Sequence, residues 1–269
     1  MQKLKSPAGL CAAAGLALGL AFGRYRAAAL LGAELWENWP LVIPVLILAV
    51  LSLQGKDTEW TPRPPAARIL ALVSACILYA AAALALLDRS GPFGLIPAIF
   101  PTLAGFGIIL SASDKGGDLI GMFSVVPVFY QGYLLLQLYR ANATDTHRAV
   151  FAVELFCVIA ILLAVYGAAS LRFLPYGQLR NCMFGGLGLY AAGLMLMPCL
   201  LAGEYVFGLD WMNGTLLLAQ AGLALHAAST ILWPPAPDLE EDEEDEEDED
   251  EEESHEEESE SEAEPEKAE

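Results

Sequence analysis

The residues of this chain that could do chemistry in an apolar setting are few, and Glu154 is the first of them. It is the sixth residue of the apolar run 149–163 (AVFAVELFCVIAILL). A carboxylate in such a run either binds a proton or takes a cation as its partner. The sequence therefore predicts proton or cation handling at Glu154, or a structural charge that Arg140, His147 or Arg148 can reach from the preceding segment.

His226 is the second candidate, within the apolar run 214–233. On a helix it shares one face with small or polar residues at spacings of three, four and seven. These residues are Thr215, Ala219, Gly222, Ser229 and Thr230. Such a face points at protein rather than at lipid. We therefore expect a hydrogen bond from His226 to a neighbouring helix, and a ligand or base role is the alternative.

Ser124 and Gln131 mark the most polar of the apolar runs, residues 119–138. One helical stripe carries Asp118, Gly121, Ser124 and Gln131, and a second carries Tyr130, Tyr133, Gln137 and Arg140. Pro127 predicts a kink in this helix. The two stripes fit the lining of a cavity or, as we favour, side chains that bridge helices, with the outer tyrosines at the membrane interface.

Motifs for catalysis are absent from the sequence. It contains no His-Glu-x-x-His, no Gly-x-Ser-x-Gly and no Gly-x-x-x-x-Gly-Lys. The Gly-Gly-Asp at 116–118 has no second intramembrane aspartate with which to form a catalytic pair. We therefore expect a protein that is not an enzyme and that holds no cofactor.

Cysteine usage predicts neither a metal site nor a disulfide framework. The five cysteines are Cys11, Cys76, Cys157, Cys182 and Cys199. They include no Cys-x-x-Cys pair, and no histidine stands at ligand spacing from them. We expect each to pack as a small apolar residue within or beside an apolar helix.

Eight apolar runs are candidates for the membrane-spanning helices that position these residues. A span needs roughly 20 mostly apolar residues, and 55% of the chain is hydrophobic, with a mean hydropathy of +0.46. The predicted spans are 7–23, 39–54, 67–87, 93–111, 119–138, 149–169, 181–203 and 214–233. The fourth to eighth are the clearest, whereas the second is short.

The N-terminal part leaves two alternatives open. Lys3 and Lys5, followed by an apolar run that ends at 21–23, also fit a cleavable signal peptide, which would leave seven spans. Residues 24–39, an Ala/Leu-rich stretch with two glutamates and two tryptophans, fit an interfacial amphipathic helix or a loop.

Charge divides the chain into two parts. Residues 238–269 hold 23 of the 34 acidic residues and one lysine, whereas the rest of the chain has 13 basic and 11 acidic residues. A segment with so much charge of one sign cannot bury enough apolar surface to fold. The sequence thus predicts an all-α polytopic membrane domain over 1–237 and a disordered acidic tail over 238–269.

Basic residues predict the orientation of the bundle. With the N-terminus inside, the inner segments hold eight basic residues before the tail and the outer segments hold five. The positive-inside rule therefore favours a cytoplasmic N-terminus and a cytoplasmic tail. We expect a plasma-membrane protein. All five tryptophans lie at or beyond the ends of the predicted spans, as an interfacial belt requires.

Small residues in the first span predict close helix packing. Gly15, Gly19 and Gly23 repeat every four residues and form a smooth strip along one helix face. Such strips let two helix backbones approach each other in lipid. Packing inside the chain is the expectation, and contact between two copies in a homo-oligomer is the alternative.

Two functions fit these features. The first is a non-enzymatic membrane anchor or assembly component whose acidic tail is a solvated element or binds a basic protein or divalent cations; nucleic acid is not an expected partner. The second is a small transporter or channel component for a cation, a proton or a small solute, with a path beside Glu154 and His226. Related sequences or mutants would be needed to choose between them.

Overall fold

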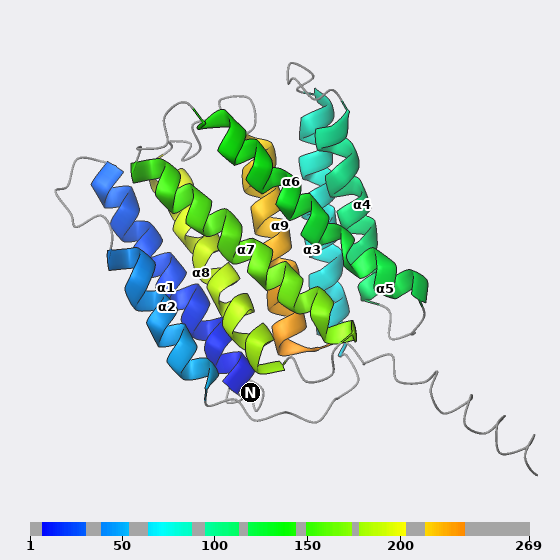
Figure 1. The fold of residues 1–269 in the computed structure, drawn as a ribbon, viewed down its shortest axis with the longest axis horizontal. Coiled ribbons are helices and arrows are strands. Elements are labelled where there is room, and N and C mark those ends of the chain that lie inside the picture. The colour runs from blue at the N-terminus through cyan, green and yellow to red at the C-terminus, as the bar shows by residue number, and fades with distance from the viewer. Residues whose placement is uncertain are drawn as a thin grey trace, which may run out of the picture.

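The computed structural model describes residues 7–30, 39–53, 64–87, 95–112, 118–143, 149–173, 178–202 and 213–234, and all secondary structure in these ranges is helical. The helices, shown in Figure 1, are α1 (Pro7–Leu30), α2 (Trp39–Ser52), α3 (Pro65–Leu87), α4 (Ile96–Ser111), α5 (Asp118–Ser124), α6 (Val126–Ala141), α7 (Ala149–Phe173), α8 (Gln178–Ala202) and α9 (Asn213–Leu232). The acidic tail and residues 31–38 of the proposed interfacial segment lie outside the described residues, whereas 24–30 continue α1.

Six segments of the described chain are long and apolar enough to cross a membrane. They are Ala8–Ala28, Pro65–Leu87, Ile120–Arg140, Phe151–Leu171, Asn181–Leu201 and Gly214–Leu232. The predicted class, an all-helical membrane bundle, is confirmed at this level. A count of eight spans is not, because α2 and α4 have only 14 and 16 residues. Helices of that length reach about 21 and 24 Å, against a hydrocarbon core of about 30 Å.

The short α4 differs most from the sequence expectation, which placed it among the clearest spans at 93–111. The helix begins only at Ile96, with Pro97 in its first turn, where a missing backbone N–H is tolerated. Pro101 lies inside the helix and removes a further backbone donor. Apolar composition predicted this helix and its end correctly, but the regular backbone begins three residues later than expected, at the turn that contains Pro97.

A break at Val125 divides the predicted span 119–138 into α5 and α6. Pro127 occupies the first turn of α6 and has no N–H to offer the carbonyl of Phe123 four residues earlier. That carbonyl instead lies against Gly107 of α4, where any side chain would collide with it. The Phe123 ring meets Phe106 edge to face, with ring centroids 5.3 Å apart. The kink therefore brings α5 against α4.

The helices form two layers. In one layer the order is α2, α1, α8, α9, α3 and α4, each in contact with the next. Helices α6 and α7 lie across this row, and Figure 1 shows them in front of it. Since α8 and α9 occupy the middle of the row and contact α7 as well, they are the most buried of the six candidate spans.

Helix α1 packs along α8 more extensively than any other pair of helices in the described chain. The three glycines of α1 face α8: Gly15 lies against the carbonyl of Gly186, and a methyl group added at Gly19 would lie 2.7 Å from the carbonyl oxygen of Tyr190. At Gly23 the corresponding distance to the carbonyl oxygen of Gly193 is 2.5 Å. The glycine strip is thus occupied by a helix of the same chain.

Apolar side chains cover much of the outer surface of the bundle. On α2 they include Val42, Leu46 and Val50, each more than half exposed, and on α3 they include Ile69 and Leu72. Contiguous apolar surface of this kind is unfavourable in water and favourable against acyl chains. The exposed faces therefore agree with helices that contact lipid.

We predict that Gly19→Ala destabilises the bundle, since the added methyl group meets a backbone carbonyl that cannot move aside alone. Overpacking typically costs about 1–3 kcal/mol. The loss should appear as a lower midpoint when the purified protein is unfolded in detergent. Gly132→Ala is the matched control, because nothing lies within 4 Å of a Cβ at Gly132. That variant should be neutral or slightly more stable, and equal destabilisation by both changes would contradict the packing.

Candidate functional site

Two glutamines form the polar centre of the bundle. Gln131 of α6 and Gln220 of α9 are almost completely buried. The Nε2 of Gln131 donates to the Oε1 of Gln220 at 2.8 Å, and the Nε2 of Gln220 donates back to the Oε1 of Gln131 at 3.1 Å. Gln131 Nε2 also donates to the backbone carbonyl of Val158 in α7 at 2.9 Å. The pair therefore joins three helices.

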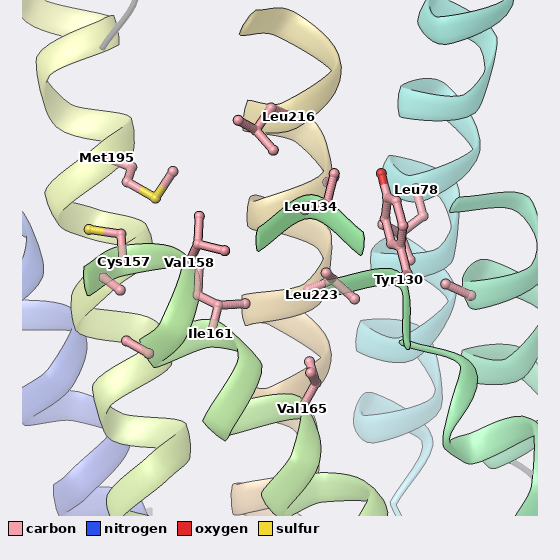
Figure 2. Packing of buried hydrophobic residues seen from close by; sticks show 14 of the residues in the cluster. Leu78, Tyr130, Leu134, Cys157, Val158, Ile161, Val165, Met195, Leu216 and Leu223 are labelled. Carbon is pink, nitrogen blue, oxygen red and sulfur yellow. The ribbon is translucent and has the colours of Figure 1, made fainter. Parts of the chain in front are cut away.

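The three helices that the glutamine pair joins also contribute to the apolar core of the bundle. Figure 2 shows Leu134 of α6, Leu223 of α9 and Val158 of α7 in that core cluster. In such surroundings an unbonded amide would cost several kcal/mol, so the two side chains satisfy each other. An amide neither titrates near neutral pH nor acts as a nucleophile. The arrangement thus serves helix association rather than bond-making chemistry.

Ser124, the other polar candidate of this segment, bonds locally. Its Oγ donates to the carbonyl of Gly121, three residues earlier on α5, at 2.6 Å. A serine bonded to its own helix in this way often accompanies a bend, and α5 ends at Ser124. The structure therefore separates Ser124, at the helix break, from Gln131, at the bundle centre, although the sequence placed both on one stripe.

The face of α9 around His226 is buried throughout. His226, Ser229 and Thr230 each have less than a tenth of their surface exposed. Ser229 Oγ donates to the carbonyl of His226 at 2.7 Å, and Thr230 Oγ1 donates to the carbonyl of Ala227 at 2.8 Å. These two hydroxyl groups are satisfied within α9 itself. The face points at protein, as its composition predicts.

Neighbouring helices bond to α9 through its backbone. Ser74 of α3 donates its Oγ hydrogen to the carbonyl of Gly222 at 2.6 Å. A methyl group at Gly222 would lie 3.2 Å from the Ser74 carbonyl oxygen, so the two helices are in close contact there. Asn181 of α8 donates to the carbonyl of Thr230 at 3.5 Å, the upper limit for such a bond. The central helix is thus tied to the helices on both sides.

Glu154 lies on α7 and is only 1% exposed. Arg26 of α1 is close enough for its guanidinium to attract the Glu154 carboxylate, and Cys157, Tyr190 and Cys199 lie in the same electrostatic neighbourhood. The Nη1 of Arg26 is buried and makes no hydrogen bond to any described residue. A buried acid and a partly buried base of opposite charge therefore share this end of the bundle.

The depth of both charges follows from their positions in the spans. Arg26 stands two residues before the end of the segment Ala8–Ala28, and Glu154 three residues after the start of Phe151–Leu171. At 1.5 Å per residue they lie about 3 and 5 Å inside the ends of their spans. Charges at this depth sit near the headgroups, where a long side chain can reach water. This placement favours a structural role for the two charges.

Sequence reasoning missed Arg26 and Gln220. The first predicted span ends at residue 23, so the prediction places Arg26 in the segment that follows it. The cations predicted to reach Glu154 are instead Arg140, His147 and Arg148. Arg140 is exposed at the end of α6, and the other two lie outside the described residues. The sequence signal that could have identified Gln220 is its polar amide, which, like that of Gln131, lies well inside an apolar run.

Neither a search for metal ligands nor a comparison with known proteins indicates a particular chemistry. Among the residues that the structure describes, no three His, Cys, Asp or Glu side chains are grouped so that they could hold a metal ion. No protein family, curated protein or solved structure matches this chain. The polar side chains and their contacts are therefore the basis for a functional proposal.

We predict that Gln131→Leu destabilises the bundle because it leaves the Gln220 amide buried without its partner. An unsatisfied buried group costs about 1–3 kcal/mol. The double variant Gln131→Leu/Gln220→Leu should recover part of this loss, and the coupling energy should be on the order of 0.6–1.7 kcal/mol, as for other hydrogen bonds between membrane helices. Reversible unfolding in detergent micelles measures Gln131→Leu, Gln220→Leu and the double variant.

Gln137→Leu is the control for the loss of an amide from α6. Gln137 is only half-buried and lies further along the same helix. Its replacement should change stability by less than about 0.5 kcal/mol, as is usual for positions away from the core. Strictly additive effects of the changes at Gln131 and Gln220 would show that the two amides are not coupled.

Proposed function

We propose that this chain is a non-enzymatic membrane anchor or assembly component, in which a helical bundle holds an acidic tail at the cytoplasmic face of the plasma membrane. The observation that carries the proposal is the separation of two chemical regimes. A nearly neutral apolar bundle precedes a segment, 238–269, with 23 acidic residues and one lysine. One part is suited to insertion in lipid, and the other to electrostatic attraction of a soluble partner.

The contacts inside the bundle support this assignment. The two buried glutamines bond to each other and to the Val158 carbonyl, and Ser74 bonds to the Gly222 carbonyl. Ser124, Ser229 and Thr230 bond to backbone within their own helices. Polar groups used in this way stabilise one arrangement of helices. An anchor requires a stable bundle.

The high density of negative charge in the tail indicates which kind of partner it would bind. Residues 240–253 are acidic without interruption. Such a segment repels itself, stays extended in solution and attracts lysine- and arginine-rich surfaces over about a Debye length, near 8 Å at physiological salt. We therefore assign the tail a basic protein as partner, with divalent cations as competing ligands.

Deletion of residues 238–269 tests the proposal. The shortened chain should insert in the membrane and unfold at the same midpoint as the full chain, because the bundle makes its contacts within residues 7–234. Basic proteins that co-purify with the full chain should be lost. Quantitative mass spectrometry of affinity-purified membranes measures both the recovery of the bundle and the set of partners.

A neutral tail of equal length is the control for this deletion. Replacement of the acidic residues by serine and glycine keeps the length of the segment but removes its charge. This variant should lose the same partners, and the partners of the full chain should dissociate as salt concentration rises. Partners that persist after deletion or neutralisation of the tail would overturn the proposal.

A second candidate function, transport of a proton or cation, rests on the carboxylate of Glu154 in a spanning helix beside Arg26. It predicts that liposomes containing the full chain dissipate a proton gradient faster than empty liposomes, and that Glu154→Gln abolishes the difference. Arg24→Gln is the control, since Arg24 is exposed near the same end of α1. An internal pH dye follows the flux. Equal rates in protein-containing and empty liposomes would exclude proton transport.

A further inference from the structure

Helices α1 and α8 run in the same direction with a fixed register. Gly15 of α1 lies against Gly186 of α8, and four residues further along both helices Gly19 lies against Tyr190. The contacts are between backbone atoms, so the two helix axes are as close as glycine permits. Cys11 stands four residues before Gly15 on α1, and Cys182 stands four residues before Gly186 on α8.

Independent observations place these two cysteines together. Cys11 and Cys182 belong to one buried cluster, which Ile231 of α9 completes. A methyl group on Gly186 would lie 3.0 Å from the Cys11 carbonyl oxygen, so the backbone of Cys11 itself contacts α8. The two thiols are also close enough to interact electrostatically. Both cysteines are in the reduced state.

Disulfide formation requires such an approach. The two Cα atoms must come within about 4.4–6.8 Å of each other, with the Cβ atoms nearer still. Most helix pairs are separated by 8–10 Å between axes, and their facing residues meet this condition only where small residues bring the backbones together. The glycine contacts between α1 and α8 supply that condition one turn away from the cysteines.

We propose that Cys11 and Cys182 are a modification site, at which a peroxide converts the two thiols into a disulfide that fastens α1 to α8. The Cys182 sulfur attacks the peroxide O–O bond, which gives a sulfenic acid and one water molecule. The Cys11 sulfur then attacks that sulfenic sulfur, the S–O bond breaks, and its hydroxyl leaves with the Cys11 proton as a second water molecule. The two thiols lose two electrons, and the peroxide gains them.

The order of these two steps follows from exposure and depth. Cys182 retains 9% of its surface and Cys11 none. Cys182 is the second residue of the segment Asn181–Leu201, and Cys11 the fourth of Ala8–Ala28. They therefore lie about 2 and 5 Å inside the ends of their spans, where a small oxidant from the aqueous phase reaches Cys182 first. In the orientation proposed above, this end faces the cytoplasm, where disulfides are usually transient and redox-sensing.

Thiol counting on the purified full chain tests the proposal. In a variant with Cys76→Ser, Cys157→Ser and Cys199→Ser, only Cys11 and Cys182 can react. A maleimide-linked polymer, added after denaturation, should attach to both thiols in untreated protein, to neither after hydrogen peroxide, and again to both after a reductant. The oxidised chain should remain monomeric on a gel and should resist unfolding in detergent more than the reduced chain.

The control moves one cysteine by a single position. In the same background, Cys11→Ser combined with Leu10→Cys moves the thiol from a fully buried residue to one that is 45% exposed. This variant should keep both labels under the same treatment. Equal oxidation in the two variants, or a disulfide that joins two chains, would overturn the proposal.

The natural chain provides a second measurement that does not depend on the serine replacements. After peroxide treatment and digestion without reductant, mass spectrometry should find the peptides of Cys11 and Cys182 linked. If all five cysteines stay reduced while the folded protein is exposed to peroxide, and the same two cysteines pair only after unfolding, the site does not exist in the native bundle.

Discussion

The close backbone contact between α1 and α8 is the interaction on which the arrangement of the bundle depends. Lipid offers no hydrophobic drive for helices to associate, so their packing relies on contact at short range and on hydrogen bonds. Gly15, Gly19 and Gly23 permit that contact over about two helical turns. With α1 fixed in this register, Arg26 lies near Glu154 at one end of the pair and Cys11 lies beside Cys182 at the other.

A second constraint, satisfaction of buried polar groups, explains the interior of the bundle. In lipid an amide or hydroxyl group has no water to bond with, so a partner within the protein lowers the cost of its burial. Gln131 and Gln220 do so across two helices, Ser74 bonds to the backbone of α9, and Ser229 and Thr230 bond within α9. The bonds between helices define which neighbours α9 accepts. A bundle stabilised in this way is suited to hold an attached segment at the membrane.

The two parts of the chain depend on different kinds of interaction. The bundle depends on close contact and is nearly neutral, whereas the segment 238–269 carries almost all of the net charge. An acidic segment interacts over a range set by salt rather than by shape, so it can meet basic surfaces of many forms. In the proposed function, joining it to a membrane bundle would confine this attraction to one side of the membrane. The proposed anchor function follows from that combination.

The sequence by itself determined the helical membrane class and the division of charge, because both depend on local composition. It did not determine where α4 begins or the break at Val125. Only the tertiary structure decided that Gln220 pairs with Gln131 and that Arg26 approaches Glu154. Spacing along one helix shows which residues share a face, but helices far apart in the chain become neighbours only through packing, which no local pattern specifies.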